Sequence, residues 1–412
     1  MLKLSDLSHF KPKDLYQAVG IHYIMQNPYC ILGDDMGLGK SFQWTAAMLK
    51  LQGPSAICCP AYLRGTWKAE LEKICKREED IRNIHITSYS KSKDFEDLLL
   101  THNIKKVGFD EAHYLKNIKA QRTDNILGAL ENVSMDRITL MSGTPIKNRI
   151  PEWYTLLTII HYHLGTDFLE KFPNEWVFSE YFCKKKTFRL KKGHGRQITT
   201  YYGVRNRAEL LSYIRPIMLR RLAKDVLDLA EPKHLYVDAD VSQIYDEELK
   251  KAFETGKDTK AKRLSALSKV GFTANHVKSI LETGDKAVMF TCHPEAAYQM
   301  KEKLKKFKFE CITGDVPVEK RQPIVDRLQN GELDGLLCSI DASSTGYTMT
   351  AANHVVLNDE PYVVGTIAQA IARTNRIGQE KPVFVHHIGG SKIDTQINKA
   401  LVSKMKDLER GM

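Results

Sequence analysis

Short apolar runs separated by amphipathic stretches recur in two parts of the chain and restrict the folds open to it. Up to residue 150 the runs are YCIL (29–32), AICC (56–59), IHIT (84–87), KKVGF (105–109) and RITLMS (137–142). From about residue 286 the rhythm returns as KAVMFT, ECIT, GLLCSI, HVVLN and VFVHHI. Fully apolar strands that alternate with helices are typical of parallel sheets covered on both faces. We therefore expect an α/β chain with two doubly wound, parallel-sheet lobes.

The middle of the chain breaks this rhythm. Residues 152–182 are rich in aromatic residues and leucine, which predicts helices that pack as core. Residues 184–207 then carry nine lysines or arginines and no acid, and Gly193-His194-Gly195 between two partly alternating stretches predicts a β-hairpin. The expected division is a first lobe over 1–150, a helical insertion with a basic hairpin and a lobe linker over 151–235, and a second lobe over 236–412.

The amino-acid composition restricts the cellular compartment and the binding partners that can be expected. The formal net charge of +11 is compatible with a polyanionic partner such as nucleic acid but does not identify one. The eight cysteines form no C-x-x-C pair, which predicts reduced thiols and no zinc site. No apolar run approaches the roughly 18 residues that a membrane span needs, and the first residues lack the pattern of a signal peptide. We expect a soluble protein of the cytoplasm, either in a bacterium or in a phage-infected host cell.

A glycine-rich loop follows the first apolar run. Gly37-Leu38-Gly39-Lys40-Ser41 lies between YCIL and a helix-prone stretch, so its backbone N–H groups and the helix dipole would favour phosphate oxygens. Lys40 would reach the β- and γ-phosphates of ATP, and the Ser41 hydroxyl would hold Mg²⁺. The strict G-x-x-x-x-G-K-[ST] spacing would place a glycine where Asp34 stands. A glycine turn with a surface lysine is therefore the alternative.

A pair of acids follows the fourth apolar run. Asp110 at the end of a buried strand would bind Mg²⁺, and Glu111 would polarise the attacking water. Adjacent carboxylates are common on protein surfaces and usually carry no function. A D-E-A-H sequence about 70 residues after G-x-G-K-S is much rarer, and the two motifs together predict an NTPase.

These motifs make the chain resemble a superfamily 2 helicase, and more narrowly a Swi/Snf-like DNA translocase. DDMGLGKS is similar to the D-E-M-G-L-G-K-T of that group, in which an acid at position 34 is the usual residue. ASSTGYTMTAA and SGTP…EWYTLL look most like the compact annealing-helicase branch that remodels forks. The resemblance implies two RecA-like lobes with ATP and Mg²⁺ between them and a helical and β-hairpin insertion.

The resemblance also implies roles for residues of the first lobe and the linker. LYQAVGIHYIM is similar to the Q motif, in which Gln17 would read the adenine edge. CCPAYLRGTWKAEL resembles motif Ia, which implies DNA contacts for Arg64 and Trp67. LMSGTPIKN resembles motif III, in which Ser142 and Thr144 would connect the nucleotide to the DNA. MLRR resembles the segment that joins the lobes, and Arg220 would contact DNA.

In the second lobe, the resemblance covers motifs V and VI. Gly346 belongs to SIDASSTGYTMTAANHVV, and Gln369 begins QAIARTNRIGQ. Arg373 and Arg376 are one helical turn apart, so both would face the nucleotide. Their planar, permanently charged guanidinium groups suit a γ-phosphate. Ala342-Ser343-Ser344 and Ala372 depart from the group's pattern, which leaves the DNA contacts of this lobe open.

The basic hairpin is a second candidate DNA contact. Aromatic residues interleave with its cations, as stacking on bases and sugars would require. A solvated charged face is the alternative. The cations expected to contact DNA are Lys185, Arg189, Lys191, Lys192 and Arg196.

The function expected from these features is an ATP-dependent DNA helicase or translocase acting on forked or four-way branched duplexes. The reactions considered are fork reversal, branch migration and strand annealing. One alternative is a duplex-DNA translocase that displaces bound proteins such as RNA polymerase. An alternative of another class is a degenerate ATPase that clamps DNA without hydrolysis.

Overall fold

The computed structural model describes residues 15–189, 197–227, 229–241, 245–254, 258–340, 342 and 346–410. The chain divides into two compact units, one comprising residues 1–226 with 404–412 and the other residues 227–403. The break lies inside the segment expected to link the lobes. Each unit contains one six-stranded parallel sheet, which confirms the expected fold class. Within the described ranges, no helix is long and apolar enough to cross a membrane.

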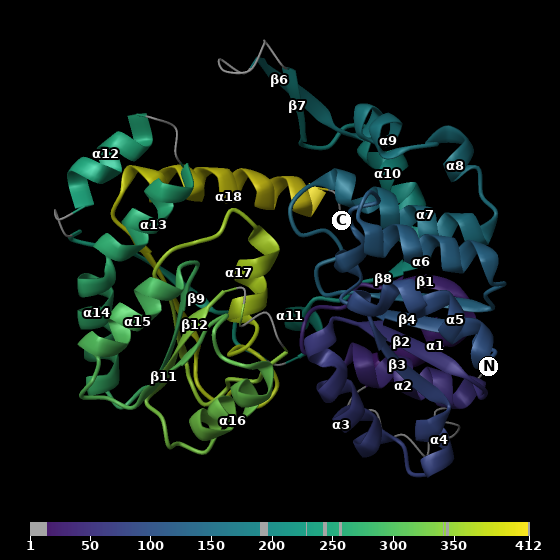
Figure 1. The fold of residues 1–412 in the computed structure, drawn as a ribbon, viewed down its shortest axis with the longest axis horizontal. Helices are drawn as coiled ribbons and strands as arrows, with labels where there is room; N and C mark the ends of the chain where they lie inside the picture. The colour runs from purple at the N-terminus through teal and green to yellow at the C-terminus, as the bar shows by residue number, and fades with distance from the viewer. Residues whose placement is uncertain are drawn as a thin grey trace. The chain divides into compact units, whose positions relative to one another are not determined.

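The sheet of the first unit has the strand order β3-β2-β4-β5-β1-β8 (Figure 1). The strands are β1 (Tyr29–Leu32), β2 (Ser55–Cys59), β3 (Ile84–Ser88), β4 (Lys106–Asp110), β5 (Arg137–Met141) and β8 (Met218–Leu219). The accompanying helices are α1 (Leu15–Gln26), α2 (Lys40–Leu51), α3 (Arg64–Ile74), α4 (Glu78–Arg82), α5 (Phe95–Thr101) and α6 (Gln121–Asn132). Every residue of β2 is buried, as expected for a strand covered on both faces.

An insertion follows β5 in the same unit. Its elements are α7 (Trp153–Leu164), α8 (Phe168–Lys171), α9 (Glu175–Phe182), the antiparallel strands β6 (Lys184–Arg189) and β7 (Gln197–Tyr202), α10 (Arg207–Ile214) and α11 (Ala223–Val226). Trp153, Phe168, Phe178 and Phe182 are fully buried, so most of the aromatic residues form core as expected. Trp176 is the main exception, with 65% of its surface exposed.

The sheet of the second unit has the order β11-β12-β10-β13-β14-β9. The strands are β9 (Lys233–Asp238), β10 (Ala287–Thr291), β11 (Phe309–Ile312), β12 (Gly335–Ser339), β13 (His354–Leu357) and β14 (Phe384–Gly389). The helices are α12 (Asp246–Glu254), α13 (Asp258–Ser268), α14 (Val270–Glu282), α15 (Pro294–Lys303), α16 (Val318–Gln329), α17 (Val364–Ile371) and α18 (Lys392–Arg410), the last of which ends in the first unit. The second lobe is therefore also a parallel α/β sheet.

Histidines on neighbouring strands of this sheet form hydrogen-bonded chains. His386 Nδ1 lies 3.0 Å from His276 Nε2, and His386 Nε2 lies 2.9 Å from His354 Nδ1. His354 Nε2 is 3.3 Å from an oxygen of Asp285, which also pairs with Lys381. Burial, followed by the neighbouring histidines, lowers the pKa of His386 to about 3. Among the described residues, no three histidine, cysteine or acidic side chains are grouped so that they could hold a metal ion.

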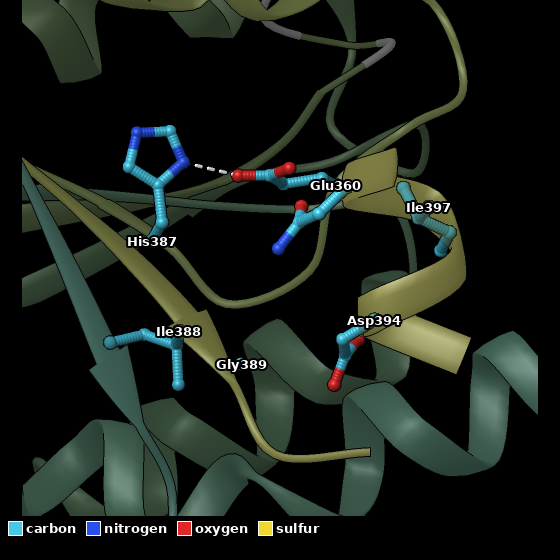
Figure 2. Close-up of a pocket in the computed structure, with 7 residues that line it drawn as sticks. Glu360, His387, Ile388, Gly389, Asp394 and Ile397 are labelled. Atoms are coloured by element: carbon cyan, nitrogen blue, oxygen red, sulfur yellow. Dashed lines mark hydrogen bonds and ion pairs between the residues drawn. The ribbon is translucent and has the colours of Figure 1, made fainter. Parts of the chain in front are cut away.

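A second pair of residues lies beside a small pocket in this unit. Figure 2 shows His387 and Glu360 joined by a hydrogen bond, with Asp394 on the other side of the pocket. The pocket measures about 10 Å³, which is room for about one water molecule. Asp394 is paired instead with the fully buried Lys269, at 2.9 Å. Lys269 also donates to the Ile388 carbonyl at 2.9 Å, which connects the start of α18 to β14.

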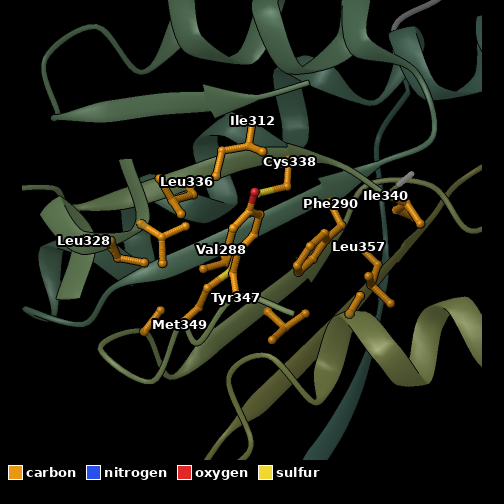
Figure 3. Packing of buried hydrophobic residues seen from close by; sticks show 14 of the residues in the cluster. Val288, Phe290, Ile312, Leu328, Leu336, Cys338, Ile340, Tyr347, Met349 and Leu357 are labelled. Carbon is orange, nitrogen blue, oxygen red and sulfur yellow. The ribbon is translucent and has the colours of Figure 1, made fainter. Parts of the chain in front are cut away.

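The apolar strands supply the core. Figure 3 shows Tyr347 beside Val288 in the second unit, with Phe290, Leu336 and Ile312 around them. All residues of β10 and β12 are buried. The eight cysteines are free, and Cys292 alone among them is not fully buried. The hydrophobic runs of the sequence thus form the two sheets and hold the polar strand ends in fixed positions.

Candidate active site

The glycine-rich loop connects β1 to α2. Gly37 and Gly39 have φ values of 84° and 74°, the left-handed region in which a side chain is unfavourable. A Cβ on Gly39 would also lie 2.6 Å from Gln17 Nε2, because α1 packs against the loop. Asp34 has no positive φ, so the backbone there does not require glycine. The backbone of the loop therefore requires glycine at positions 37 and 39 but not at position 34.

Lys40 is the first residue of α2 and points back into the loop. Its ammonium donates hydrogen bonds to the backbone oxygens of Asp34 at 2.8 Å and Asp35 at 3.0 Å. Burial lowers the pKa of Lys40, and the charges of Glu111, Asp34, Asp110 and Asp35 oppose that shift. A cation held among carbonyl and carboxylate oxygens at a helix N-terminus suits the phosphates of a nucleotide.

Asp110 ends β4, next to Met141 at the end of β5. Its Oδ1 accepts the N–H of Glu111 at 2.9 Å, and its Oδ2 accepts the indole N–H of Trp67 at 2.8 Å. Burial, followed by the charge of Glu111, raises the pKa of Asp110 to about 6. The carboxylate is thus held in one orientation at the carboxyl end of the sheet, where a nearby cation would favour its charged form.

Glu111 adopts a left-handed conformation, with φ of 51° and ψ of 49°. This region costs a non-glycine residue of the order of 1 kcal/mol and is concentrated at functional sites. Its carboxylate lies 3.2 Å from His113 Nδ1. Burial would raise the pKa of Glu111, but His113 and Lys40 together lower it to about 2. Glu111 is therefore ionised and ready to accept a proton or to orient water.

The motif III residues join this arrangement through His113. His113 Nδ1 lies 3.1 Å from Ser142 Oγ, which also accepts the N–H of Thr144 at 3.2 Å. A Cβ on Gly143 would lie 2.8 Å from the Met36 side chain and 3.4 Å from Lys40 Nζ. Residues 142–144 are therefore in direct contact with both the glycine-rich loop and the D-E-A-H segment.

Sequence reasoning missed the buried partner of Asp34. Asp34 is fully buried, and both of its oxygens are paired with the guanidinium of Arg221. Gln43 Nε2 donates to Asp34 at 3.2 Å, and Arg221 donates to Gln43 Oε1 at 2.9 Å. The backbone of the loop also pairs with the same segment, since Asp35 N–H donates to the Arg221 carbonyl at 2.9 Å. The sequence did contain one signal for this pair, because an acid such as Asp34 inside a phosphate-binding loop needs a cation beside it.

Three residues expected to contact DNA form hydrogen bonds with residues of the candidate ATP site. Trp67 is 2% exposed, and its indole N–H is bound to Asp110. Ser142 is 1% exposed and is bound to His113. Arg220 donates to the Gly33 carbonyl at 3.1 Å, and burial lowers its pKa. Arg64 is exposed at the start of α3, and Thr144 is partly buried, so their DNA contacts stay predictions.

In the second unit, Arg373 and Arg376 follow α17 but do not lie on it, because that helix ends at Ile371. The expectation that they share one helical face was therefore wrong. The Arg373 carbonyl accepts the N–H of Met349 at 2.8 Å, a residue outside this segment, so the helical hydrogen bonds do not continue past it. Both arginines are nevertheless largely enclosed, and burial, followed by Arg373, lowers the pKa of Arg376 to about 10.

Gln369 and Gly346 are the other residues of the second unit that were expected to bind the nucleotide. Gln369 is buried on α17, and Gly346 is exposed in the loop before Tyr347. Arg376 Nη1 donates to Thr348 Oγ1 at 3.0 Å, which connects motif VI to the motif V segment within the same unit. The roles of these residues toward ATP stay predictions.

The basic hairpin exists as the antiparallel pair β6 and β7. Lys185 Nζ forms an ion pair with Glu180 at 2.8 Å. Arg189 is the last residue of β6, and its side chain lies outside the described residues. Lys191, Lys192 and Arg196, together with the Gly193-His194-Gly195 turn, also lie outside them.

Comparison with known proteins identifies the family. A model of the SNF2-related domain matches residues 77–296, which is more than half of the chain, and a model of the helicase conserved C-terminal domain matches residues 273–378. A SWI/SNF-related matrix-associated actin-dependent regulator of chromatin subfamily A-like protein 1 homolog from Caenorhabditis elegans is 27% identical over 95% of this chain and 61% of its own length.

Two further relatives and one solved structure complete the comparison. The DNA annealing helicase and endonuclease ZRANB3 of Homo sapiens is 26% identical over 92% of this chain and 38% of its own length. The putative ATP-dependent helicase/translocase YwqA of Bacillus subtilis is 25% identical over 94% and 47%. The Sulfolobus solfataricus SWI2/SNF2 ATPase core in complex with dsDNA is 20% identical, with a TM-score of 0.42, over 95% of this chain and 91% of that chain.

The chain spans 38% to 61% of the length of these curated relatives. The region shared with them includes both parallel-sheet units, and the two domain models together cover residues 77–378. The chain belongs to the SNF2-related family, and it carries a helicase C-terminal domain.

Proposed function

We propose that this chain is an ATP-dependent DNA translocase that remodels forked or four-way branched DNA. The observation that carries the proposal is the buried group formed by Lys40, Asp110 and Glu111, in which one cation and two differently tuned carboxylates converge at the end of one sheet. Carboxylates with pKa values displaced in opposite directions are typical of catalytic sites in which the two groups have different roles.

The residues fit a nucleotide with Mg²⁺. Ser41 follows Lys40 in the first turn of α2, and together with the Asp110 carboxylate it would hold the ion. Bound Mg²⁺ would neutralise phosphate charge as the terminal phosphoryl group is transferred. The left-handed Gly37 and Gly39 leave the loop free of side chains where the phosphates would approach. Gln17, packed on the loop through the Leu38 carbonyl, would contact the adenine.

The chain's own groups would then divide the work of hydrolysis. Lys40 would exchange its carbonyl partners for phosphate oxygens. The ionised Glu111 would orient water and accept its proton, and His113 would keep the carboxylate in place. Arg373 and Arg376 would supply guanidinium groups for the charge that develops on the γ-phosphate.

The proposed preference for branched DNA rests on the similarity to named relatives. The names of the human and bovine relatives include DNA annealing helicase, which favours a strand-annealing or fork-remodelling reaction. A translocase that displaces proteins from plain duplex is the second candidate, and the same fold would serve it. The two differ in a measurable way, because a junction enzyme should hydrolyse ATP faster on forks and four-way junctions than on blunt duplex of equal length.

The test of the proposal is a Glu111→Gln variant. It should bind ATP with an affinity close to that of the parent chain but hydrolyse it at least about 100-fold more slowly, because general-base catalysis contributes roughly 10²–10⁴-fold. The matched control is Glu131→Gln, which changes an exposed acid of α6 and should leave the rate unchanged. Normal turnover by Glu111→Gln would assign the base elsewhere. If the parent chain hydrolysed ATP on no DNA, the proposed function would be wrong and the alternative of a non-hydrolysing DNA clamp would remain.

A further inference from the structure

The two faces of the β6–β7 ribbon differ in a way that its sequence alone does not reveal. Figure 1 shows the ribbon leading away from α9 and α10. The antiparallel register pairs Lys184 with Tyr202, Lys186 with Thr200 and Phe188 with Ile198. Side chains of alternate residues point to opposite faces of a strand, so these three pairs share one face, which we call the outer face. The intervening pairs share the other, which we call the anchored face.

The anchored face is tied to the body of the first unit. Tyr201 donates its hydroxyl to Glu180 at 2.8 Å, and Lys185 forms its ion pair with the same carboxylate. Further along the ribbon, the Thr187 and Thr199 hydroxyls are bonded to each other at 3.1 Å. The side chains of the Lys185–Tyr201 and Thr187–Thr199 pairs are therefore bonded within the protein, and the bonds to Glu180 fix which side of the ribbon turns outward.

The outer face carries apolar groups in contact with water. Phe188 is 46% exposed, Ile198 is 42% exposed and Tyr202 is 50% exposed. Large apolar side chains gathered on one exposed surface, with cations around them, are typical of binding sites. Lys186 Nζ lies 5.0 Å from the centre of the Phe188 ring, so a cation sits beside an aromatic surface. Lys184 adds a second exposed cation next to Tyr202.

The charge of the ribbon indicates the chemistry of its partner. The described residues of β6 and β7 include three lysines and no acid. Phe188 and Tyr202 are four residues apart along the ribbon, which is about 14 Å at the usual rise of a strand. That separation equals about four base steps along a nucleic acid strand. Aromatic rings spaced along a positively charged surface are how proteins bind single strands without sequence preference.

We propose that the outer face binds single-stranded DNA at the point where it leaves a duplex. Bases would stack on Phe188 and Tyr202, while Lys184 and Lys186 would contact the phosphates between them. This inference rests on the proposed function for its biological setting, but binding to this face does not require ATP. It also replaces Lys185, which the sequence suggested, with Lys184 and Lys186 as the contacting cations.

Two adjacent lysines provide a matched test. Lys186→Ala and Lys185→Ala remove the same charge from the same strand but from opposite faces. Binding would be measured without ATP, using the full chain and a labelled fork with single-stranded arms of mixed sequence, with a blunt duplex of equal length as the comparison. We expect Lys186→Ala to weaken fork binding several-fold and Lys185→Ala to leave it nearly unchanged. Equal effects of the two changes would overturn the assignment of the outer face.

The aromatic contact is tested in the same assay. Loss of one base stack weakens binding by about 5- to 150-fold, so Phe188→Ala should fall in the lower part of that range, since its ring is half exposed. Thr187→Ala, on the anchored face, is the control. The Lys184→Ala, Lys186→Ala double change should reduce the slope of log affinity against log salt by about 1.4, the value for two phosphate contacts on a single strand.

Three outcomes would contradict the proposal. Equal weakening of blunt-duplex and fork binding by Phe188→Ala would make the outer face a duplex contact. Unchanged fork binding in both outer-face variants, with loss of self-association in sedimentation, would make it an interface between copies of the chain. Unchanged binding with no such loss would leave the face without this role. Absence of ATP hydrolysis in the parent chain would instead refute the proposed function without affecting the binding result.

Discussion

Restoring a glycine at position 34 should damage this protein, although it would restore the strict phosphate-loop pattern. Asp34 is fully buried and pairs with Arg221 through both oxygens. It also accepts hydrogen bonds from Gln43 Nε2 at 3.2 Å and from the Arg221 N–H at 3.2 Å. The Asp34→Gly change removes all of these acceptors at once and leaves the Arg221 charge inside the first unit.

The size of the expected loss of stability depends on the contacts that Arg221 would keep in the Asp34→Gly variant. Removal of one partner from a buried ion pair costs about 3–5 kcal/mol, because the remaining charge is left uncompensated. Arg221 would keep Gln43 Oε1, the Tyr16 carbonyl and the face of the Tyr16 ring, whose centre is 5.4 Å away. We therefore expect the lower end, a loss of about 3 kcal/mol in the free energy of unfolding of the first unit. That corresponds to a fall of about 6–12 °C in its thermal midpoint.

The assay is urea unfolding followed by tryptophan fluorescence, since Trp44 and Trp67 are buried in this unit. Asp34→Asn keeps one oxygen acceptor but no charge and should lie between the parent and Asp34→Gly. The exposed Arg215→Ala change, a few residues before Arg221, controls for loss of a cation from this segment. A destabilisation below about 1 kcal/mol for Asp34→Gly would refute the reasoning, since it falls outside the range for a broken buried pair.

Two further predictions concern the pH dependence of stability and Asp110, the carboxylate proposed to bind Mg²⁺. The folded-state pKa of His386, about 3, lies below the value near 6.5 expected on unfolding, so stability is greatest above pH 6.5 and falls as the pH drops toward 3. Urea titrations should show that the free energy of unfolding of the second unit falls by about 1 kcal/mol between pH 6.5 and 5. This is less than the ~2 kcal/mol limit for one unscreened histidine. An unchanged free energy of unfolding in this window would contradict the histidine chain with His276 and His354. The Trp67→Phe change removes the indole donor from Asp110 and should lower DNA-stimulated kcat/KM about tenfold, the equivalent of one hydrogen bond to a charged group, with unchanged DNA affinity. Weaker DNA binding with normal turnover would restore Trp67 as a DNA contact.

The sequence predicted those parts of the site that depend on local rules. Gly37 and Gly39 were recognisable because the left-handed backbone of a phosphate loop tolerates little else. Asp110 and Glu111 were recognisable because they end an apolar strand, and the ends of parallel strands meet at one edge of a sheet. The two sheets followed from the apolar runs for the same reason. Each of these features is set by neighbours along the chain.

The features that the sequence did not predict depend on distant partners. Arg221 pairs with Asp34 across 187 positions of sequence, and of two adjacent arginines the sequence analysis singled out Arg220. Trp67 was expected to face DNA because motif Ia does so in related proteins, but its ring is buried and its N–H is used by Asp110. Arg376 was expected on a helix because its spacing suits one, yet α17 ends before it. Spacing and motif membership do not specify which tertiary partner a polar group finds.

The central proposal is that Arg373 and Arg376 supply guanidinium groups for the γ-phosphate during ATP hydrolysis. Its most direct test is DNA-stimulated ATP turnover by Arg376→Ala, with ATP affinity measured in parallel and the exposed Arg327→Ala as control. The account predicts a loss of about 10³-fold or more in kcat, the usual effect of removing an arginine finger, with a much smaller change in ATP affinity and no change in the control. Undiminished turnover by Arg376→Ala would show that this guanidinium takes no part in hydrolysis.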